Sequence, residues 1–242
     1  MTKDVYKTLR EKAREIAGSK GWLHKTVKVT AKALSIEEAI GNPEETDFPL
    51  QKGKERLMQA VFNNARGQAF TDRFGDFEGP LGDILSGRLD NNYRRAIFVA
   101  TLNAMMRRID LAHGTIHCRD REPAQCAGEL AAYLRYRHKW ARIAQVGFQP
   151  RMIEVLSRKF PLRVVDLDTD NIGARPFGIT IEGPEATKDA IQWADVLLVT
   201  GSTLVNGTIG SFLVNKPVIF YGTTIAGAAY LMGWERFCAC GH

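Results

Sequence analysis

The sequence predicts an α/β protein with a Rossmann-like parallel sheet in its second half and a smaller α+β unit in its first half. From residue 140 onward, short apolar runs alternate with helical segments, which is the pattern of parallel strands joined by right-handed crossovers. Before residue 140, strands that are neighbours along the chain are followed by helices, as in α+β domains. We therefore expect two domains, residues 1–139 and 140–242.

The composition is that of a globular protein, with 242 residues, 45% apolar residues and a formal charge of +6. Much of the positive charge lies in residues 1–30, where we expect a solvated helix face because no nucleic-acid motif accompanies it. No run approaches the roughly 18 apolar residues of a membrane span, and the N-terminus lacks a secretory apolar core. We therefore expect a cytoplasmic protein with reduced thiols, no membrane partner and no nucleic-acid partner.

Residues 5–17 are predicted to form a helix, because apolar side chains recur there at spacings of three and four. Residues 26–34 alternate between apolar and polar side chains, as a half-buried strand does. A Ser-x-x-Glu capping box predicts a single helical turn at residues 36–40. Two further strands, 56–62 and 67–71, are separated by a turn-forming segment and are predicted to form a hairpin.

Residues 72–79 are predicted to be a glycine-punctuated loop that contains Asp72 and Glu78. Such carboxylates can bind a metal ion or act as acid and base, although the residue types alone favour a surface loop. Helices are predicted for residues 80–85, 91–109 and 124–136. Asn103 lies in the apolar middle of the longest of these helices, so it is either a structural hydrogen-bond hub or a pocket residue.

The second half alternates strands and helices. The strands are predicted at residues 142–148, 162–167, 195–200 and 217–221, and the helices at 150–160, 184–193, 204–213 and 225–232. Residues 196–199 are a continuous apolar run, as in a strand that is covered on both faces. In parallel sheets of this kind, ligands bind outside the carboxyl ends of the strands. The segments that follow the strands would meet there, namely residues 147–150, 166–168, 200–208 and 222–224.

Two neighbouring strand ends carry the same Gly-Ser/Thr-Thr form, which favours a ligand pocket over turn chemistry alone. Ser202 or Thr203 can cap the next helix, whose free amide groups would seat an anion. The sequence has no Gly-x-Gly-x-x-Gly after a strand and no Walker A loop. Asp168 follows the second strand, where a nucleotide-binding sheet places its ribose-binding acid, so an adenosine cofactor is left open.

Two segments, residues 113–126 and 238–242, hold all four cysteines and most of the histidines. Imidazole and thiolate are good zinc ligands, but neither segment has the spacing of a zinc finger. We therefore expect buried or unengaged side chains at these positions, and no disulfide in a reducing compartment.

Three motifs resemble those of one known family. They are Thr-Gly-Ser-Thr-Leu-Val-Asn-Gly-Thr at residues 200–208, Pro-Val-Ile-Phe-Tyr-Gly-Thr-Thr-Ile-Ala-Gly at 217–227 and Gly-Gln-Ala-Phe-Thr-Asp at 67–72. The chain resembles the "putative heavy-metal chelation" family, a domain of unknown function in bacteria and archaea, over most of residues 26–238. The resemblance implies an N-terminal domain like the cap of enolase, a Rossmann-like C-terminal domain and an active site between them.

We expect a cleft between the domains that binds a metal ion, a metal chelate or another small molecule, in either a binding protein or an enzyme. Asp72, Glu78 and Asp168 would act as metal ligands or as acid and base, and a divalent metal ion would be the cofactor. The predicted ligand-binding residues are Asn103, Gln149, Gly201, Ser202, Thr203, Asn206, Gly207, Thr208, Gly222, Thr223 and Thr224.

Two alternatives stay open. One is a metal-independent α/β enzyme or nucleotide-binding module, and the other is an adaptor whose basic first helix binds nucleic acid. A homo-oligomer is also compatible with the sequence.

Overall fold

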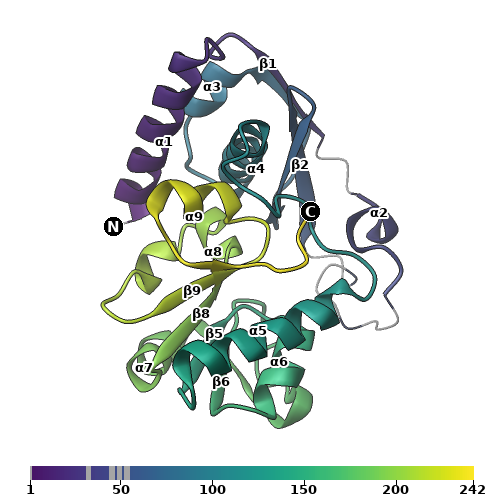
Figure 1. Ribbon diagram of the computed structural model, residues 1–242, viewed down its shortest axis with the longest axis vertical. Coiled ribbons are helices and arrows are strands. Elements are labelled where there is room, and N and C mark those ends of the chain that lie inside the picture. The colour runs from purple at the N-terminus through teal and green to yellow at the C-terminus, as the bar shows by residue number, and fades with distance from the viewer. Residues whose placement is uncertain (1, 31–33, 44–46, 48–50, 52–54) are drawn as a thin grey trace.

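The computed structural model describes residues 2–30, 34–43, 47, 51 and 55–242, and this part of the chain forms two sheets (Figure 1). An antiparallel sheet has the strand order β3-β2-β1-β4, and a parallel sheet has the order β10-β9-β8-β5-β6-β7. The antiparallel strands are β1 (Thr26–Thr30), β2 (Arg56–Phe62), β3 (Ala65–Thr71) and β4 (Phe77–Pro80). The parallel strands are β5 (Ile143–Val146), β6 (Leu162–Val165), β7 (Ile181–Glu182), β8 (Val196–Thr200), β9 (Val218–Tyr221) and β10 (Arg236–Phe237). The predicted α/β fold class is confirmed.

Helices lie between the two sheets and around them (Figure 1). They are α1 (Thr2–Ser19), α2 (Ile36–Ile40), α3 (Leu81–Ser86), α4 (Asn92–Arg108), α5 (Glu122–His138), α6 (Pro150–Ser157), α7 (Thr187–Trp193), α8 (Ser202–Val205) and α9 (Ala226–Met232), with the 3-10 turns η2 (Pro176–Gly178), η3 (Pro184–Ala186) and η4 (Ile209–Phe212). None of the described helices is both long enough and apolar enough to cross a lipid bilayer.

The parallel sheet has the strand order of a Rossmann fold. The first strand of this sheet, β5, lies in the middle, with β6 and β7 on one side and β8, β9 and β10 on the other. The chain therefore reverses its direction of travel across the sheet between β5 and β8. In doubly wound sheets, the crevice at this reversal is where ligands bind, outside the carboxyl ends of the strands.

Helix α4 lies at the centre of the core. Its residues from Ala96 to Met106 are all buried, as expected for a helix that is apolar on all sides. One apolar cluster joins Val99 of α4 to Phe62 of β2 and to Phe220 of β9. The helix packs on β2 and β3 of the antiparallel sheet and on α8 and α9, which lie between it and the parallel sheet (Figure 1). The two sheets share one core.

The other face of the parallel sheet is covered by α5 and α6. Along β8, Leu197 and Val199 belong to the cluster around α4, whereas Val196 and Leu198 pack with Leu130 of α5. This alternation explains the continuous apolar run that predicted the strand. The domain boundary near residue 139 stays a prediction, and α5 packs on the second sheet although it precedes that boundary.

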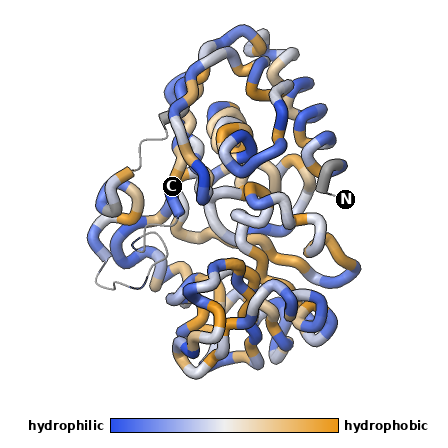
Figure 2. The backbone as a smooth tube through the Cα atoms, turned by 180° about the vertical axis from the view of Figure 1, so that it is seen from behind, coloured by the Kyte–Doolittle hydropathy of each residue, from blue (hydrophilic) through white to orange (hydrophobic). Residues whose placement is uncertain are grey.

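Helix α1 is amphipathic. Leu9 and Ala13 are fully buried, while Lys7 and Arg14 are exposed. Figure 2 shows this as an alternation of hydrophilic and hydrophobic stretches along the helix. The basic residues of α1 therefore lie mainly on a solvated face.

Two local predictions in the first half differ from the structure. The hairpin between β2 and β3 turns through Asn63 and Asn64, both with positive φ, so β3 begins earlier than expected. This is the backbone of a tight two-residue turn, which asparagine tolerates well. The end of the predicted loop 72–79 is strand β4, which pairs antiparallel with β1 at the edge of the sheet. Its four residues are too short for a periodic signal. Predicted strand residues 31–33 lie outside the described part of the chain.

The predicted helix 204–213 is replaced by two short pieces, α8 and η4. Gly207 separates them with a left-handed backbone angle, φ +75°. Glycine adopts this conformation readily and is a poor helix former, so the turn at Asn206 and Gly207 ends α8 after one turn.

Candidate functional site

A cavity of about 730 Å³ lies at the carboxyl ends of β5, β6, β8 and β9, where the strand order reverses. Phe70 in β3 and Asp72 directly after it close the cavity on the side of the antiparallel sheet. Its lining includes the predicted residues Asp72, Gln149, Asp168, Gly201, Ser202, Thr203, Asn206, Thr208, Gly222, Thr223 and Thr224. The lining does not include Asn103, Glu78 or Gly207.

Glycines allow the strand ends to pack directly against one another. A Cβ atom at Gly147 would lie 2.7 Å from Thr200 Cγ2 and 2.9 Å from Tyr221 Oη, and the backbone there has φ +98°. A Cβ atom at Gly201 would lie 2.7 Å from the backbone nitrogen of Ile225. The tips of β5, β8 and β9 therefore meet as the sequence predicted, at the same edge of the sheet.

Asp166 fixes the tips of β5 and β6. Its carboxylate accepts hydrogen bonds from the backbone N–H groups of Phe148 (2.6 Å) and Asp168 (2.7 Å). The amide of Asn171 donates to the same carboxylate at 3.3 Å. This network holds Asp168 at the cavity wall, where its own carboxylate accepts a hydrogen bond from the N–H of Asp170 (3.0 Å).

Glu55 is a cavity residue that the sequence analysis missed. Burial, and after it the nearby carboxylates of Asp166, Asp168 and Asp72, raise the pKa of its carboxyl group to about 7. Glu55 directly precedes β2 as a single acid without a motif, so only the fold reveals that it faces three other acids. A carboxyl group with a pKa near neutrality can exchange a proton under physiological conditions.

Asp72 and Gln149 line the cavity and also have structural bonds. The side-chain amide of Asn92 donates to the Asp72 carboxylate at 2.6 Å. Gln149 caps α6, because its side-chain oxygen accepts a hydrogen bond from the N–H of Met152 (2.8 Å). One carboxylate oxygen of Asp72 and the side-chain oxygen of Gln149 therefore already accept a hydrogen bond within the protein.

Asn103 is a hydrogen-bond hub behind the cavity. Its amide nitrogen donates to the carbonyls of Gln68 (2.9 Å), Thr223 (3.2 Å) and Thr224 (3.0 Å), and its oxygen accepts from the N–H of Gly227 (2.8 Å). Of the two interpretations left open by the sequence, these contacts favour the structural one. Asn103 shapes the β9 tip that lines the cavity.

Thr224 connects that tip to the antiparallel sheet. Its hydroxyl oxygen accepts a hydrogen bond from the backbone N–H of Phe70 (3.1 Å). The two walls of the cavity are thus joined directly at this point.

The expected anion seat at the start of the helix after β8 needs correction. The N-cap residue of α8 is Gly201, and no side chain caps this helix. Thr203 instead donates from its hydroxyl to the carbonyl of Thr200 (2.7 Å). Since α8 has only one turn, it has little of the dipole on which the expectation depended.

The remaining predicted residues lie apart from the cavity. Glu78 is an exposed residue of β4, in register with Lys28 of β1. Gly207 lies next to the guanidinium group of Arg95. In the part of the chain that the structure describes, no three His, Cys, Asp or Glu side chains converge as a set of metal ligands.

The structure brings the two cysteine segments together, which the sequence did not predict. His117, Cys118, Cys126 and Cys238 all line the same cavity. Burial lowers the pKa of His117 to about 4, so its imidazole is neutral at physiological pH. Burial is the main cause that raises the pKa of Cys118, and the neighbouring thiols act in the same direction.

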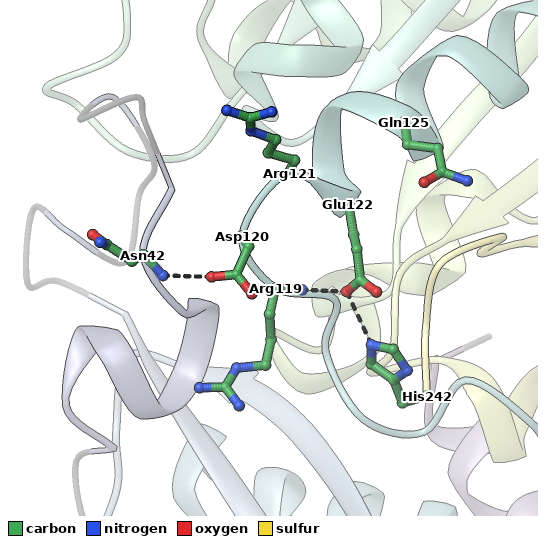
Figure 3. Close-up of a pocket in the computed structure, with 7 residues that line it drawn as sticks. All are labelled: Asn42, Arg119, Asp120, Arg121, Glu122, Gln125 and His242. Carbon is green, nitrogen blue, oxygen red and sulfur yellow. Dashed lines mark hydrogen bonds and ion pairs between the residues drawn. The ribbon is translucent and has the colours of Figure 1, made fainter.

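A second, more open pocket lies near α2 and the start of α5, away from the strand tips (Figure 3). Its charged groups largely engage one another. Asp120 accepts the N–H of Asn42 (2.7 Å), and Glu122 accepts the N–H of Arg119 (2.6 Å) and contacts the ring of His242 (2.9 Å). The side chains of Arg119 and Arg121 point away from each other. We therefore regard the cavity at the strand ends as the functional candidate.

One solved structure has a similar fold. A crystal structure of a protein of unknown function from the DUF364 family of Pyrococcus horikoshii matches with a TM-score of 0.52 and 14% identity, over 91% of this chain and 79% of that one. A DUF364 protein of unknown function from Desulfitobacterium hafniense matches with a TM-score of 0.48 and 14% identity, over 73% of this chain and 72% of that one. No curated protein matches the chain. Residues 132–226 match the family profile of DUF364, which is described as "Putative heavy-metal chelation".

Proposed function

We propose that the cavity binds a metal chelate, that is, a metal cation carried by a small organic ligand. The observation that carries the proposal is the meeting of acids, hydroxyls and apolar side chains around one cavity at the reversal of the strand order. The description of the DUF364 family supports a general role in metal binding.

The acids favour a cation. Glu55, Asp72, Asp166 and Asp168 line the cavity, and the mutual repulsion of their carboxylates is one cause of the raised pKa of Glu55. A bound cation would offset this repulsion and lower the pKa of Glu55, because a nearby positive charge stabilises the ionised carboxylate. An anion without a cation would meet the same four acids and be repelled.

The tips of β8 and β9 favour an organic component. Ser202, Asn206, Thr208 and Thr223 bring neutral hydroxyl and amide groups to the lining, and these can donate hydrogen bonds to the oxygens of a chelator. Phe148, Met152 and Phe212 add apolar surface. A lining that is partly apolar with a few polar groups is typical of small-molecule sites. The proposal accordingly assigns most of the metal coordination to the ligand and only one or two bonds to the protein carboxylates.

Titration calorimetry on demetallated protein tests the proposal with Mn²⁺, citrate and the Mn²⁺–citrate complex as probes. Mn²⁺ is chosen because it prefers oxygen ligands. We expect the complex to bind more tightly than either component, and Glu55→Gln and Asp72→Asn to weaken its binding by about ten-fold or more. Ser202→Ala should weaken the complex and leave the weaker binding of Mn²⁺ alone unchanged.

Glu78→Gln is the matched control, since it makes the same change at an exposed carboxylate outside the cavity. The proposal fails if none of the three probes binds, or if Glu78→Gln weakens binding as much as Glu55→Gln does.

A nucleotide is the second candidate, because Asp168 follows β6 in a sheet with the Rossmann strand order. Thermal protection by ATP, NAD or S-adenosylmethionine without metal, lost in Asp168→Asn, would favour this metal-independent alternative.

A further inference from the structure

The edge of the parallel sheet at which its strands begin lies opposite the cavity, and it carries a basic and aromatic surface. β5 begins there at Ile143, whose backbone N–H donates to the carbonyl of Pro161 (2.9 Å), the residue before β6. The carboxyl-terminal ends of α5 and α6, which pack on each other, therefore reach this edge (Figure 1). The amino-edge surface is formed there by the exposed residues Arg135, Tyr136, Arg137, Lys139, Trp140 and Lys159.

Two large aromatic side chains of this surface face solvent. Tyr136 is 85% exposed and Trp140 is 69% exposed, more than any other large hydrophobic side chain in the described part of the chain. Rings that stay in water gain little of the hydrophobic stabilisation that burial gives, so these two contribute little to the fold. Tyrosine and tryptophan are enriched where proteins bind partners.

The guanidinium group of Arg135 is stacked on the ring of Trp140. Its Cζ atom lies 3.4 Å from the centre of the ring, which is a cation–π contact. Lys139 ends α5 with a positive φ of 54°, and the chain turns there so that Trp140 returns to the last turn of the helix. Arg135 thus orients the ring, and most of the Trp140 side chain is still open to a planar partner.

The charge around the two rings is positive. Four of the six residues of the amino-edge surface are Arg or Lys, and residues 130–153 contain no acid. Among the residues that the structure describes, no carboxylate forms an ion pair with Arg137, Lys139 or Lys159. Positive charge that is not neutralised within the protein attracts a polyanion.

We infer that the amino-edge surface binds single-stranded nucleic acid, with bases stacked on Trp140 and Tyr136 and phosphates held by the Arg and Lys side chains. Stacking tolerates any sequence because every base has a flat face, and a basic surface follows the phosphate backbone. An anionic membrane fits less well, because surfaces that enter lipid also present Leu or Phe side chains, and the amino-edge surface has none.

This surface is distinct from the basic first helix, on which the expectation of no nucleic-acid partner was based. It is also distinct from the proposed chelate site, because β5 begins at the amino-edge surface and ends at the cavity. The two proposals can therefore fail independently of each other.

Fluorescence anisotropy of the full chain with labelled oligo(U) and oligo(dT) of about 12 nucleotides tests the stacking. Trp140→Ala and Tyr136→Ala should each weaken binding by about five-fold or more. Tyr230→Ala is the matched control, since it removes an exposed tyrosine from α9, and should change the affinity by less than about two-fold. Trp140→Phe should retain binding within about three-fold and remove most of the quenching of tryptophan fluorescence by the oligonucleotide.

The salt dependence of binding tests the charges. Replacing Arg137 and Lys139 together by glutamine should lower the slope of log affinity against log salt by about one, because two phosphate contacts are lost. Replacing Lys7 and Arg14 together by glutamine removes the same charge from the exposed face of α1 and should leave the slope unchanged.

Circular dichroism establishes that each variant is folded. Three results would each overturn the inference: no oligonucleotide binding at about 100 µM protein and 0.1 M salt, binding that Trp140→Ala does not weaken, or a loss of slope in the α1 variant instead of the amino-edge variant. Binding to phosphatidylserine vesicles without binding to either oligonucleotide would also overturn it, in favour of a membrane surface.

Discussion

Replacing Glu55 by glutamine should change how the stability of the protein depends on pH. The ordinary pKa of a glutamate carboxyl group is 4.5, and burial with three neighbouring acids raises that of Glu55 to about 7. The folded state therefore binds more protons than the unfolded state between these values. The free energy of unfolding that Glu55 contributes is fully present below pH 4.5 and is lost as the pH rises through 7.

The size of this loss follows from the two pKa values. A difference between 4.5 and about 7 corresponds to on the order of 3 kcal/mol, and water in the cavity reduces it towards about 2 kcal/mol. Glutamine has a similar shape and cannot ionise. We therefore expect Glu55→Gln to gain about 2–3 kcal/mol relative to the unsubstituted protein between about pH 5 and pH 8.5.

Urea unfolding at several pH values measures this gain directly, since both proteins should have the same dependence on urea. A stability difference that stays constant across the pH range would refute the assignment of Glu55 as a buried acid in a cluster. A gain of equal size in Glu78→Gln, at an exposed position outside the cavity, would refute burial as its cause.

Three further predictions concern the cavity and its support. Mn²⁺–citrate binding at about pH 6 should release up to one proton from Glu55, whereas binding at about pH 9 should release none because Glu55 is already ionised. Calorimetry in two buffers of different ionisation enthalpy measures the number of protons released, and equal release at both pH values would contradict the prediction. Asn103→Ala should lower the free energy of unfolding by about 2–4 kcal/mol, because three carbonyls and one N–H lose their buried partner. A loss below about 0.5 kcal/mol in urea unfolding would contradict the structural role of these hydrogen bonds. Gly201→Ala should weaken Mn²⁺–citrate binding and destabilise the protein by about 1–3 kcal/mol, because the added Cβ would meet the backbone of Ile225. Gly128→Ala is the control and should be neutral or slightly stabilising, because Gly128 lies in α5 with open space around it. Equal effects of the two substitutions would count against close packing of the strand tips.

The sequence predicted the parallel sheet and its strand ends well because those signals are local. The apolar run 196–199 ends at the glycine after β8, and the strand before Gly222 has the same form. In parallel sheets such ends must gather at one edge, so their meeting could be predicted without coordinates. The structure places most of the predicted ligand residues along this one cavity.

The features that the sequence did not predict depend on contacts between distant segments. Glu55 gains its raised pKa from burial and from acids that follow β6 and β3. The cysteine segments meet through backbone hydrogen bonds between Ile116 and His242, and backbone atoms leave no pattern of side chains. Glu78 was expected in the cleft because it follows Asp72 closely, but β4 carries it to the edge of the other sheet.

The shared core around α4 bears on how a guest would enter. Val99 packs with residues of both sheets, and Thr224 accepts a hydrogen bond from the backbone of β3. The two walls of the cavity therefore cannot move apart without exposing the shared apolar core to water. The cavity is therefore already formed in the free protein and does not require a hinge motion. We therefore expect rapid, single-step association whose speed scales linearly with guest concentration, as for a rigid receptor.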